Sequence, residues 1–493
     1  MGLHKKKTEQ DIFEILPQAI AAFKKSMIAP FLGEGRDKYI NDRPPLRGEL
    51  FTEEQLKQHA RVICKNHELI SDHPSEQLLK RLAENERILL EVHEKLTNVV
   101  GDNERIVPAA EWLLDNFYLI EEQIYIGKKH FPKGYSRGLP QLAKGESAGL
   151  PRVYDMAVEI ISHSDGQINL SNLTSFITAY QTNTFLKIGE LWALPIMLRL
   201  ALLENLRRIS IQIFIDITYK SLANEWADKL ISTAETNAKN LVLIIADMAR
   251  SEPPMESSFV AELTRRLLEK GNRLSLPVNW IEQQLAEHGF TTEDLIQQEN
   301  QKQAADQVSI SNSISSLRFL GSTDWREFVE NTSIVEQVLK EDINGIYSGM
   351  DFYTRDQYRH AIEKIAKRSD LSEQAVAIMA IEAAKTNAAG NDDARLSHVG
   401  YYLVGKGLQK MQKQVRVKSS KIESCRKITR RFPLFVYIGS IILLTSFFSW
   451  TLTVKANNDG LHSWKLLLLV MVCFFAASQL AVSVVNWLST LLV

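Results

Sequence analysis

The stretch KIGELWALPIMLRLALLENLRRIS, residues Lys187 to Ser210, is apolar enough to suggest a membrane span. Four charged side chains interrupt its second half: Arg199, Glu204, Arg207 and Arg208. Charged side chains are costly at the centre of a bilayer, so this stretch cannot cross a membrane cheaply. Glu204 lies three and four residues before the arginine pair, which is ion-pair spacing on a helix. Pro195 bends a helix or marks its early part. We therefore predict a buried, bent core helix.

The rest of the chain also predicts a mainly helical protein. Its 493 residues include 23 glycines and 14 prolines, a low usage that indicates helices joined by short loops. Apolar residues recur at three- and four-residue spacing in residues 53–69 and 75–100, and no sustained two-residue alternation predicts a large sheet. The 58 basic and 59 acidic residues nearly cancel, which argues against a nucleic-acid-binding protein.

Two segments near the end of the chain carry no charged residue: Phe432 to Val454, over 23 residues, and Leu466 to Val493, over 28. A helix of about 20 mostly apolar residues crosses a bilayer, so both are predicted transmembrane helices. The connection 455–465 is short, so the two helices form an antiparallel hairpin. The chain ends inside the second apolar segment, and we expect it to be a piece of a longer protein.

A basic run precedes the first apolar segment. Residues 410–431 contain nine lysines and arginines, and the last four are Arg426, Lys427, Arg430 and Arg431. The loop 455–465 offers only two lysines. Because basic residues stay on the cytoplasmic side, these four are predicted topology determinants that keep the preceding residues in the cytoplasm. They also predict contact with anionic membrane lipid rather than with nucleic acid.

The breaks in the helical pattern predict the domain organisation. Residues 132–153 (PKGYSRGLPQLAKGESAGLPRV) are rich in Gly, Pro and Ser, so they are interpreted as the join between two helical domains. The predicted parts are an N-terminal helical domain (1–133), a linker (134–152), a second helical domain (153–409), a basic juxtamembrane segment (410–431), two transmembrane helices (432–454 and 466–493) and an extracytoplasmic loop (455–465).

No motif predicts an active site by spacing alone. The three cysteines, Cys64, Cys425 and Cys473, form no CxxC pair, and no Cys/His spacing indicates a metal site. Residues 134–140 (GYSRGLP) lack the glycine spacing of a phosphate loop, and no dinucleotide fingerprint occurs. We therefore predict no catalytic residue, no cofactor-binding residue, no metal ligand and no cofactor in this chain.

Residues 108–131 predict one helix that places carboxylates beside aromatic rings. Pro108 fits the first turn, and lysines fall near the end. Asp115 and Glu122, with Trp112 nearby, are the residue types of a sugar site, where acids transfer protons and rings stack on sugar faces. Two carboxylates prove little without their mutual geometry, and an ordinary surface helix explains the same residues.

Two other patterns have ordinary helical explanations. Residues 162–173 resemble the middle of a calcium loop around Asp165, but Ile161 and Asn172 stand where the loop needs acids. Two helices joined by a turn are therefore predicted. Residues 350–369 gather basic side chains around tyrosines, as in a phosphate or nucleic-acid contact, but acids and bases that pair across helical turns explain them as well.

Eight phrases of this sequence together resemble the N-terminal region of cyclic β-1,2-glucan synthases, very large bacterial inner-membrane proteins, in which they recur in the same order. They are RPPLRGELFTEEQLKQHA, PAAEWLLDNFYLIEEQI, HFPKGYSRGLPQL, PRVYDMAVEIISHSDGQI, IGELWALPIMLRLALLENLRR, DWREFVENTSIVEQVLKED, MDFYTRDQYRHAIEKIA and HVGYYLVGKG. The resemblance runs from about Arg43 to Val493. Eight phrases in order are more specific than any single short motif.

The resemblance implies a cytoplasmic helical region that leads into the first membrane hairpin of such a synthase in the bacterial inner membrane. In this family a glycosyltransferase domain builds β-1,2-glucan from UDP-glucose with the protein itself as acceptor, and a phosphorylase-like region trims the glucan before it is closed into a ring. These regions would lie beyond Val493, so no catalytic, UDP-binding or metal residue is carried over.

The implied partners are membrane lipid, the missing transferase and phosphorylase-like regions, and a growing β-glucan. Residue type makes Trp112, Tyr118 and Tyr135 candidate glucan contacts. Three hypotheses of function stay open: a structural or regulatory part of a glucan synthase, a free-standing membrane-anchored scaffold that binds a partner synthase, and a helical glycosidase that uses Asp115 and Glu122. The order of the eight phrases favours the first.

Overall fold

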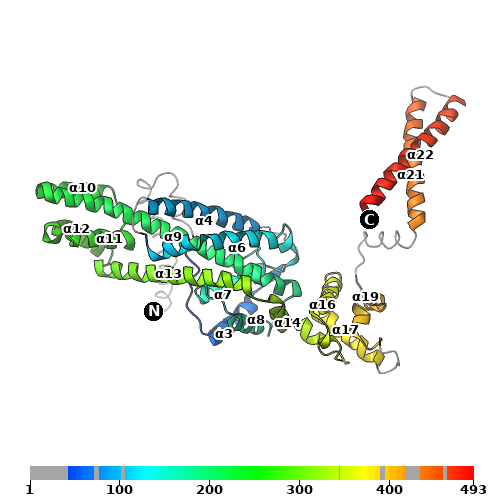
Figure 1. Ribbon diagram of the computed structural model, residues 1–493, viewed down its shortest axis with the longest axis horizontal. Coiled ribbons are helices and arrows are strands. Elements are labelled where there is room, and N and C mark those ends of the chain that lie inside the picture. The colour runs from blue at the N-terminus through cyan, green and yellow to red at the C-terminus, as the bar shows by residue number, and fades with distance from the viewer. Residues whose placement is uncertain are drawn as a thin grey trace, which may run out of the picture. The chain divides into compact units, whose positions relative to one another are not determined.

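The computed structural model describes residues 43–70, 77–101, 106–343, 345–388, 395–417, 433–458 and 464–492 (Figure 1). Nearly all regular structure in these ranges is helical, which confirms the predicted mainly α class. The chain divides into two compact units, Met1–Gln337 and Val338–Val493. The predicted topology determinants Arg426, Lys427, Arg430 and Arg431 lie outside the described residues.

The stretch Lys187–Ser210 forms the start of α9 (Ile188–Asn237), a helix of 50 residues with Pro195 in its interior. The four charged side chains in its second half, Arg199, Glu204, Arg207 and Arg208, are buried. Arg199 donates a hydrogen bond to Gln123 over 2.8 Å. Glu204 accepts hydrogen bonds from Arg208 and from the hydroxyl of Tyr154. The prediction of a buried core helix is confirmed.

Helices from both halves of the first unit pack around α9 (Figure 1). They are α4 (Gln77–Gly101), α5 (Pro108–Asp115), α6 (Phe117–His130), α7 (Arg152–His163), α13 (Thr292–Ser322) and α14 (Trp325–Thr332). Together they enclose one hydrophobic core that extends from Leu46 to Val329. Residues before and after 134–152, which the sequence analysis placed between two domains, share this core.

The segment 134–152 is tied to the helices by backbone hydrogen bonds. After the 3-10 turn η1 (Tyr135–Gly138), strand β2 (Gln141–Leu142) pairs antiparallel with β1 (Leu69–Ile70). The amide of Ala143 donates to the carbonyl of Glu68 over 2.8 Å. This two-stranded ribbon is the sheet found in the described part of the chain.

Two further helices pack against each other in the first unit, α3 (Glu53–Asn66) and α8 (Leu170–Tyr180). Thr52 starts α3 with a capping box, because its amide donates to the Gln55 side chain over 2.9 Å while its hydroxyl accepts from the Gln55 amide. The turn between α7 and α8 contains Asp165, whose φ is 49°. The predicted pair of helices around residues 162–173 is thus confirmed.

The predicted single helix over 108–131 is wrong, because Asn116 separates α5 from α6 with φ −109° and ψ 10°. Its side-chain amide donates to the carbonyl of Trp112 over 2.9 Å. Its side-chain oxygen accepts from Arg318 of α13 over 2.6 Å. A hydrogen bond from a distant helix therefore holds the break, and local periodicity does not reveal it.

The C-terminal half of α9 carries a second, smaller core. The elements packed around it are η2 (Ala238–Asn240), α10 (Leu241–Arg250), α11 (Ser257–Leu268), η3 (Gly271–Leu274) and α12 (Ser275–Glu287). Trp226 and Leu230 of α9 meet Phe259 and Leu263 of α11 in this core. Because α11 also contacts α13, the pair α9 and α13 links the two cores.

The helices that follow are short until the apolar pair. They are α15 (Ile334–Leu339), η4 (Tyr347–Gly349), α16 (Phe352–Ala366), α17 (Glu373–Ala388), α18 (Val399–Leu403) and α19 (Leu408–Gln414). On α16, Asp356 pairs with Arg359 at 3.2 Å and Glu363 with Lys367 at 2.7 Å. These pairs confirm the interpretation of residues 350–369 as a helix with paired charges.

The last two helices, α21 (Pro433–Asn458) and α22 (Trp464–Leu492), pack against each other. Both contain a segment long and apolar enough to cross a membrane, Leu434–Ala456 and Leu467–Thr490. Most residues of these segments are exposed, whereas a core helix of a soluble protein is buried. The predicted pair of apolar C-terminal helices is confirmed.

Candidate functional site

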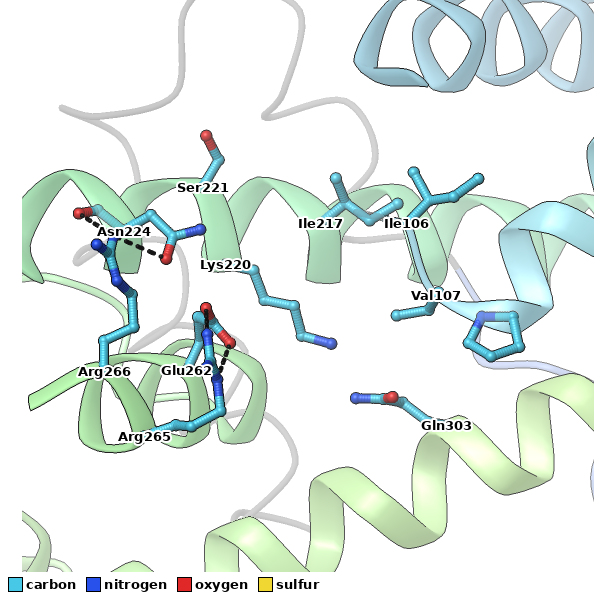
Figure 2. A pocket seen from close by; sticks show the side chains of 11 residues that line it. Ile106, Val107, Ile217, Lys220, Ser221, Asn224, Glu262, Arg265, Arg266 and Gln303 are labelled. Carbon is cyan, nitrogen blue, oxygen red and sulfur yellow. Dashed lines mark hydrogen bonds and ion pairs between the residues drawn. The ribbon is translucent and has the colours of Figure 1, made fainter. Parts of the chain in front are cut away.

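A pocket of about 680 Å³ lies at the start of α5, between the C-terminal half of α9, α11 and α13 (Figure 2). Its apolar wall consists of Ile106, Val107, Pro108 and Ile217. Its polar wall consists of Lys220, Ser221, Asn224, Glu262, Arg265, Arg266 and Gln303. The pocket thus combines one apolar face with hydroxyl, amide, carboxylate and cationic groups, as small-molecule sites commonly do.

Lys220 and Gln303 extend into the pocket from α9 and α13 (Figure 2). Both contact the buried carboxylate of Glu299, Lys220 at 2.8 Å and Gln303 at 2.6 Å. The Ser257 hydroxyl donates to the other oxygen of Glu299 over 3.0 Å. Burial alone would raise the pKa of Glu299, but the hydrogen bond and charge of Lys220, with the other two donors, outweigh it and lower this pKa.

Each cation of the pocket already has an anionic partner. Lys220 has Glu299, as described above. Arg265 forms an ion pair with Glu262 at 2.6 Å, and Arg266 forms one with Asp228 at 2.6 Å. Arg266 also donates to the carbonyl and the side-chain oxygen of Asn224 over 3.3 Å. The positive charges are therefore balanced, which favours a neutral, hydroxyl-bearing ligand over a phosphate.

Two further ion pairs hold the carboxylates of Asp216 on α9 and Asp306 on α13, both of which are buried. Lys302 pairs with Asp216 at 2.7 Å, and Arg47 pairs with Asp306 at 2.7 Å. Burial raises the pKa of Asp216 to about 6, although Lys302 opposes the shift. Burial likewise raises the pKa of Asp306, against the opposing charge of Arg47. The pair of Lys302 with Asp216 joins α13 to α9, and the pair of Arg47 with Asp306 joins the segment before α3 to α13.

None of the pocket-lining residues is among the predicted glucan contacts. Trp112 on α5 is 37% exposed and Tyr118 on α6 is 63% exposed. Tyr135 lies in η1, where its ring packs 5.2 Å from that of Phe131. These three residues remain predicted contacts at surfaces separate from the pocket lining.

The two carboxylates of the predicted sugar site, Asp115 and Glu122, are both exposed and lie on different helices, α5 and α6. The break at Asn116 separates them. Within the described residues no hydrogen bond or ion pair joins these two side chains, so their pairing as an acid and a base stays a prediction.

The sequence analysis missed the pocket residues. A signal is present, because Lys220 and Asn224 are four residues apart on α9, and Glu262 and Arg266 are four residues apart on α11. Such spacing is common on exposed helices, however, and only the packing of α9, α11 and α13 brings the pairs to one pocket. The residues that line the pocket include no histidine or cysteine, so they offer no imidazole nitrogen and no thiolate to a metal.

Comparison with known proteins shows what this helical chain is similar to. It is 31% identical over 414 residues to the cyclic β-(1,2)-glucan synthase NdvB of Rhizobium meliloti (strain 1021). The chain is related to cyclic β-(1,2)-glucan synthases. The match covers 83% of the chain, so the resemblance to this family that the eight phrases predict is confirmed.

The chain spans 14% of the length of that cyclic β-(1,2)-glucan synthase. No protein-family model matches the chain. The 414 matched residues are more than either compact unit contains, Met1–Gln337 or Val338–Val493. The similarity therefore includes part of both units.

Proposed function

We propose that this chain is the N-terminal cytoplasmic and membrane-anchoring part of a cyclic β-1,2-glucan synthase that polymerises glucose from UDP-glucose. In this proposal the chain has a structural or regulatory role and carries none of the transferase chemistry. The identity of 31% over 83% of the chain is the observation that supports the proposal most strongly. The described helices, with their buried ion pairs, suit a rigid support for other regions.

In the same proposal, α21 and α22 anchor the protein in the bacterial inner membrane as a hairpin, and the preceding helices stay in the cytoplasm. The exposed apolar surfaces of α21 and α22 support contact with lipid. The basic residues Arg426, Lys427, Arg430 and Arg431 support the orientation by their position in the sequence. Further partners are the transferase and phosphorylase-like regions of the synthase.

The pocket between α9, α11 and α13 is the place where we expect this region to contact a growing β-glucan. A glucan is neutral and rich in hydroxyls, and the pocket offers amides, a hydroxyl and internally paired charges as hydrogen-bond partners. Its apolar wall suits the C–H face of a sugar ring. Contact here would guide or retain a chain that is made elsewhere in the synthase.

Membranes of cells that make this protein provide the test. Immunoblots with an antibody against residues 43–337 are expected to show a polypeptide much longer than 493 residues. A band of 493 residues would instead support the free-standing scaffold, and affinity capture would then be expected to recover a glycosyltransferase.

The same membranes are expected to convert labelled UDP-glucose into β-1,2-glucan. An in-frame deletion of residues 106–337 in the natural gene is expected to reduce this product severely while the remaining protein stays in the membrane. The amount of the deleted protein is compared with a second antibody, raised against residues 345–388, which the deletion leaves in place. Unchanged glucan at equal amounts of protein would contradict a supporting role for this region.

A further inference from the structure

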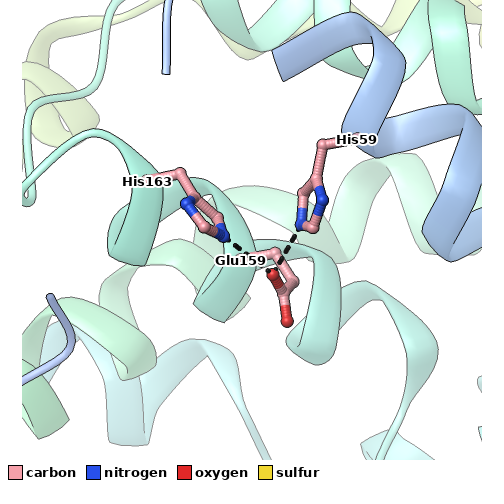
Figure 3. Close-up of side chains that lie close together, drawn as sticks. All are labelled: His59, Glu159 and His163. Carbon is pink, nitrogen blue, oxygen red and sulfur yellow. Dashed lines mark hydrogen bonds and ion pairs between the residues drawn. The ribbon is translucent and has the colours of Figure 1, made fainter. Parts of the chain in front are cut away.

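Three potential metal ligands from two helices meet in the first unit, away from the pocket (Figure 3). His59 comes from α3, and Glu159 and His163 come from one face of α7, four residues apart. One carboxylate oxygen of Glu159 lies 2.7 Å from Nε2 of His59 and 3.5 Å from Nε2 of His163. The three ligand atoms all lie within 4.8 Å of one another.

The ring of His163 is held so that its Nε2 faces the cluster. Its Nδ1 lies 2.7 Å from the backbone carbonyl of Glu49, which can only accept a hydrogen bond, so Nδ1 carries the proton. In the neutral ring the lone pair is then on Nε2. The distance of 3.5 Å from this nitrogen to Glu159 is longer than an ordinary hydrogen bond, so the lone pair is available to a cation.

The backbone of residues 48–51 fixes this arrangement. The amide of Gly48 donates to the carbonyl of Ser162 over 2.8 Å, and the amide of Phe51 donates to the carbonyl of His163 over 3.0 Å. The Phe51 ring stacks on the His163 ring at 3.9 Å with an angle of 4°. A side chain at position 48 would place its Cβ 2.9 Å from the His163 ring, so glycine makes room for the imidazole.

The distances suit a small divalent ion. Zinc binds histidine nitrogen and carboxylate oxygen at about 2.0–2.2 Å, so tetrahedral ligand atoms lie roughly 3.3 Å apart. The distances from the Glu159 oxygen to the two imidazole nitrogens, 2.7 Å and 3.5 Å, lie on either side of this value. The His59, Glu159 and His163 side chains are 23%, 30% and 15% exposed, so an ion and a water molecule can reach them.

We propose that His59, Glu159 and His163 bind one Zn²⁺ ion, with a water molecule as the fourth ligand. Without the ion, Nε2 of His59 donates its proton in a hydrogen bond to Glu159 over 2.7 Å. When the ion binds, this proton moves through solvent to Nδ1 of the same ring, which leaves the Nε2 lone pair for the metal. Two imidazoles and one carboxylate form a known zinc ligand set, and the carbonyl of Glu49 orients His163 as outer-shell partners of metal-bound histidines do. The ion joins α3 and the preceding segment to α7. It therefore acts as a metal clip that stabilises this part of the first unit, and it is independent of the proposed glucan contact.

The test uses the full chain in detergent, purified without a histidine tag, stripped with a chelator and titrated with ZnCl₂ against a fluorescent zinc chelator. The wild type is expected to bind one more zinc ion than His163→Gln, His59→Gln and Glu159→Gln, or to bind it at least about tenfold more tightly. The matched control is His130→Gln, an exposed histidine at the end of α6, which is expected to behave as the wild type.

A second measurement separates loss of the site from loss of the fold. Without metal, Glu159→Gln is expected to unfold near the wild-type temperature, because glutamine preserves the shape of the side chain. Zinc is expected to raise the unfolding temperature of the wild type and of His130→Gln but not that of Glu159→Gln. The reason is that an ion stabilises the folded state only of a protein that binds it. Equal zinc binding and equal thermal shifts in all the proteins would overturn the proposal.

Discussion

Arg152 at the start of α7 forms a two-point ion pair with Glu190 at the start of α9. Nε of Arg152 lies 2.6 Å from one carboxylate oxygen, and its terminal nitrogen lies 2.7 Å from the other. The side chains are 3% and 0% exposed. Glu190 also accepts the amide of Lys187 over 2.9 Å, so the same carboxylate caps α9 and binds α7.

Replacement of Arg152 by alanine is expected to destabilise the first unit by about 3–5 kcal/mol, because it leaves the Glu190 carboxylate buried without its charge partner. Thermal unfolding followed by tryptophan fluorescence measures the loss. The control Arg250→Ala removes an exposed pair with Asp247 and is expected to change stability little. Equal effects of the two substitutions would contradict a special role for the buried pair.

The pH dependence of stability is expected to include a contribution from Asp216. Its pKa is raised from 3.8 to about 6, so the folded protein retains this proton at pH values where the unfolded chain has lost it. Stability therefore falls as the pH rises from about 4 to about 6, by up to about 3 kcal/mol from this group. Below this window both states hold the proton, and above it both have lost it.

Asp216→Asn removes the titratable carboxyl group. The stability of this variant is therefore expected to depend less on pH between pH 4 and 7 than that of the wild type. The measurement is the shift of the unfolding midpoint between the two pH values. The exposed Asp247→Asn serves as the control and is expected to keep the wild-type dependence. If Asp216→Asn also kept the wild-type pH dependence, this result would contradict a raised pKa of Asp216.

Binding of β-1,2-glucan oligosaccharides is expected to depend on Gln303. Gln303→Ala removes an amide from the pocket wall, so the affinity measured by calorimetry on the full chain is expected to fall about tenfold, the cost of one hydrogen bond in a pocket of paired charges. The matched control is Gln283→Ala on the exposed side of α12.

The same titration tests the aromatic residues predicted from the sequence. If glucan binds in the pocket alone, Trp112→Ala, Tyr118→Ala and Tyr135→Ala retain wild-type affinity. Loss of binding in these variants, with normal binding by Gln303→Ala, would move the glucan contact from the pocket to the aromatic surfaces.

The break between α5 and α6 is expected to depend on Asn116. Asn116→Ala removes the hydrogen bonds to the Trp112 carbonyl and from Arg318, so we expect a loss of about 1–3 kcal/mol. Thermal unfolding measures it, with the exposed Asn300→Ala on α13 as the control. A stability of Asn116→Ala equal to that of the control would show that the backbone sets the break without this side chain.

The sequence by itself determined the features that depend on neighbours along the chain. The periodicity of apolar residues gave the helices, and uninterrupted apolar length gave α21 and α22. The charged residues of Lys187–Ser210 excluded a span and indicated a buried helix. These inferences hold because helical spacing and segment length act within a few turns.

Only the tertiary structure decided the break at Asn116, the pocket and the histidine cluster. Arg318 lies 202 residues after Asn116, and Glu159 lies 100 residues after His59. Gln303 and Lys220 contact the same carboxylate, that of Glu299, only because α9 and α13 pack against each other. Contacts between residues so far apart in the sequence form when the helices bury their apolar faces against one another. No local sequence pattern therefore predicts them.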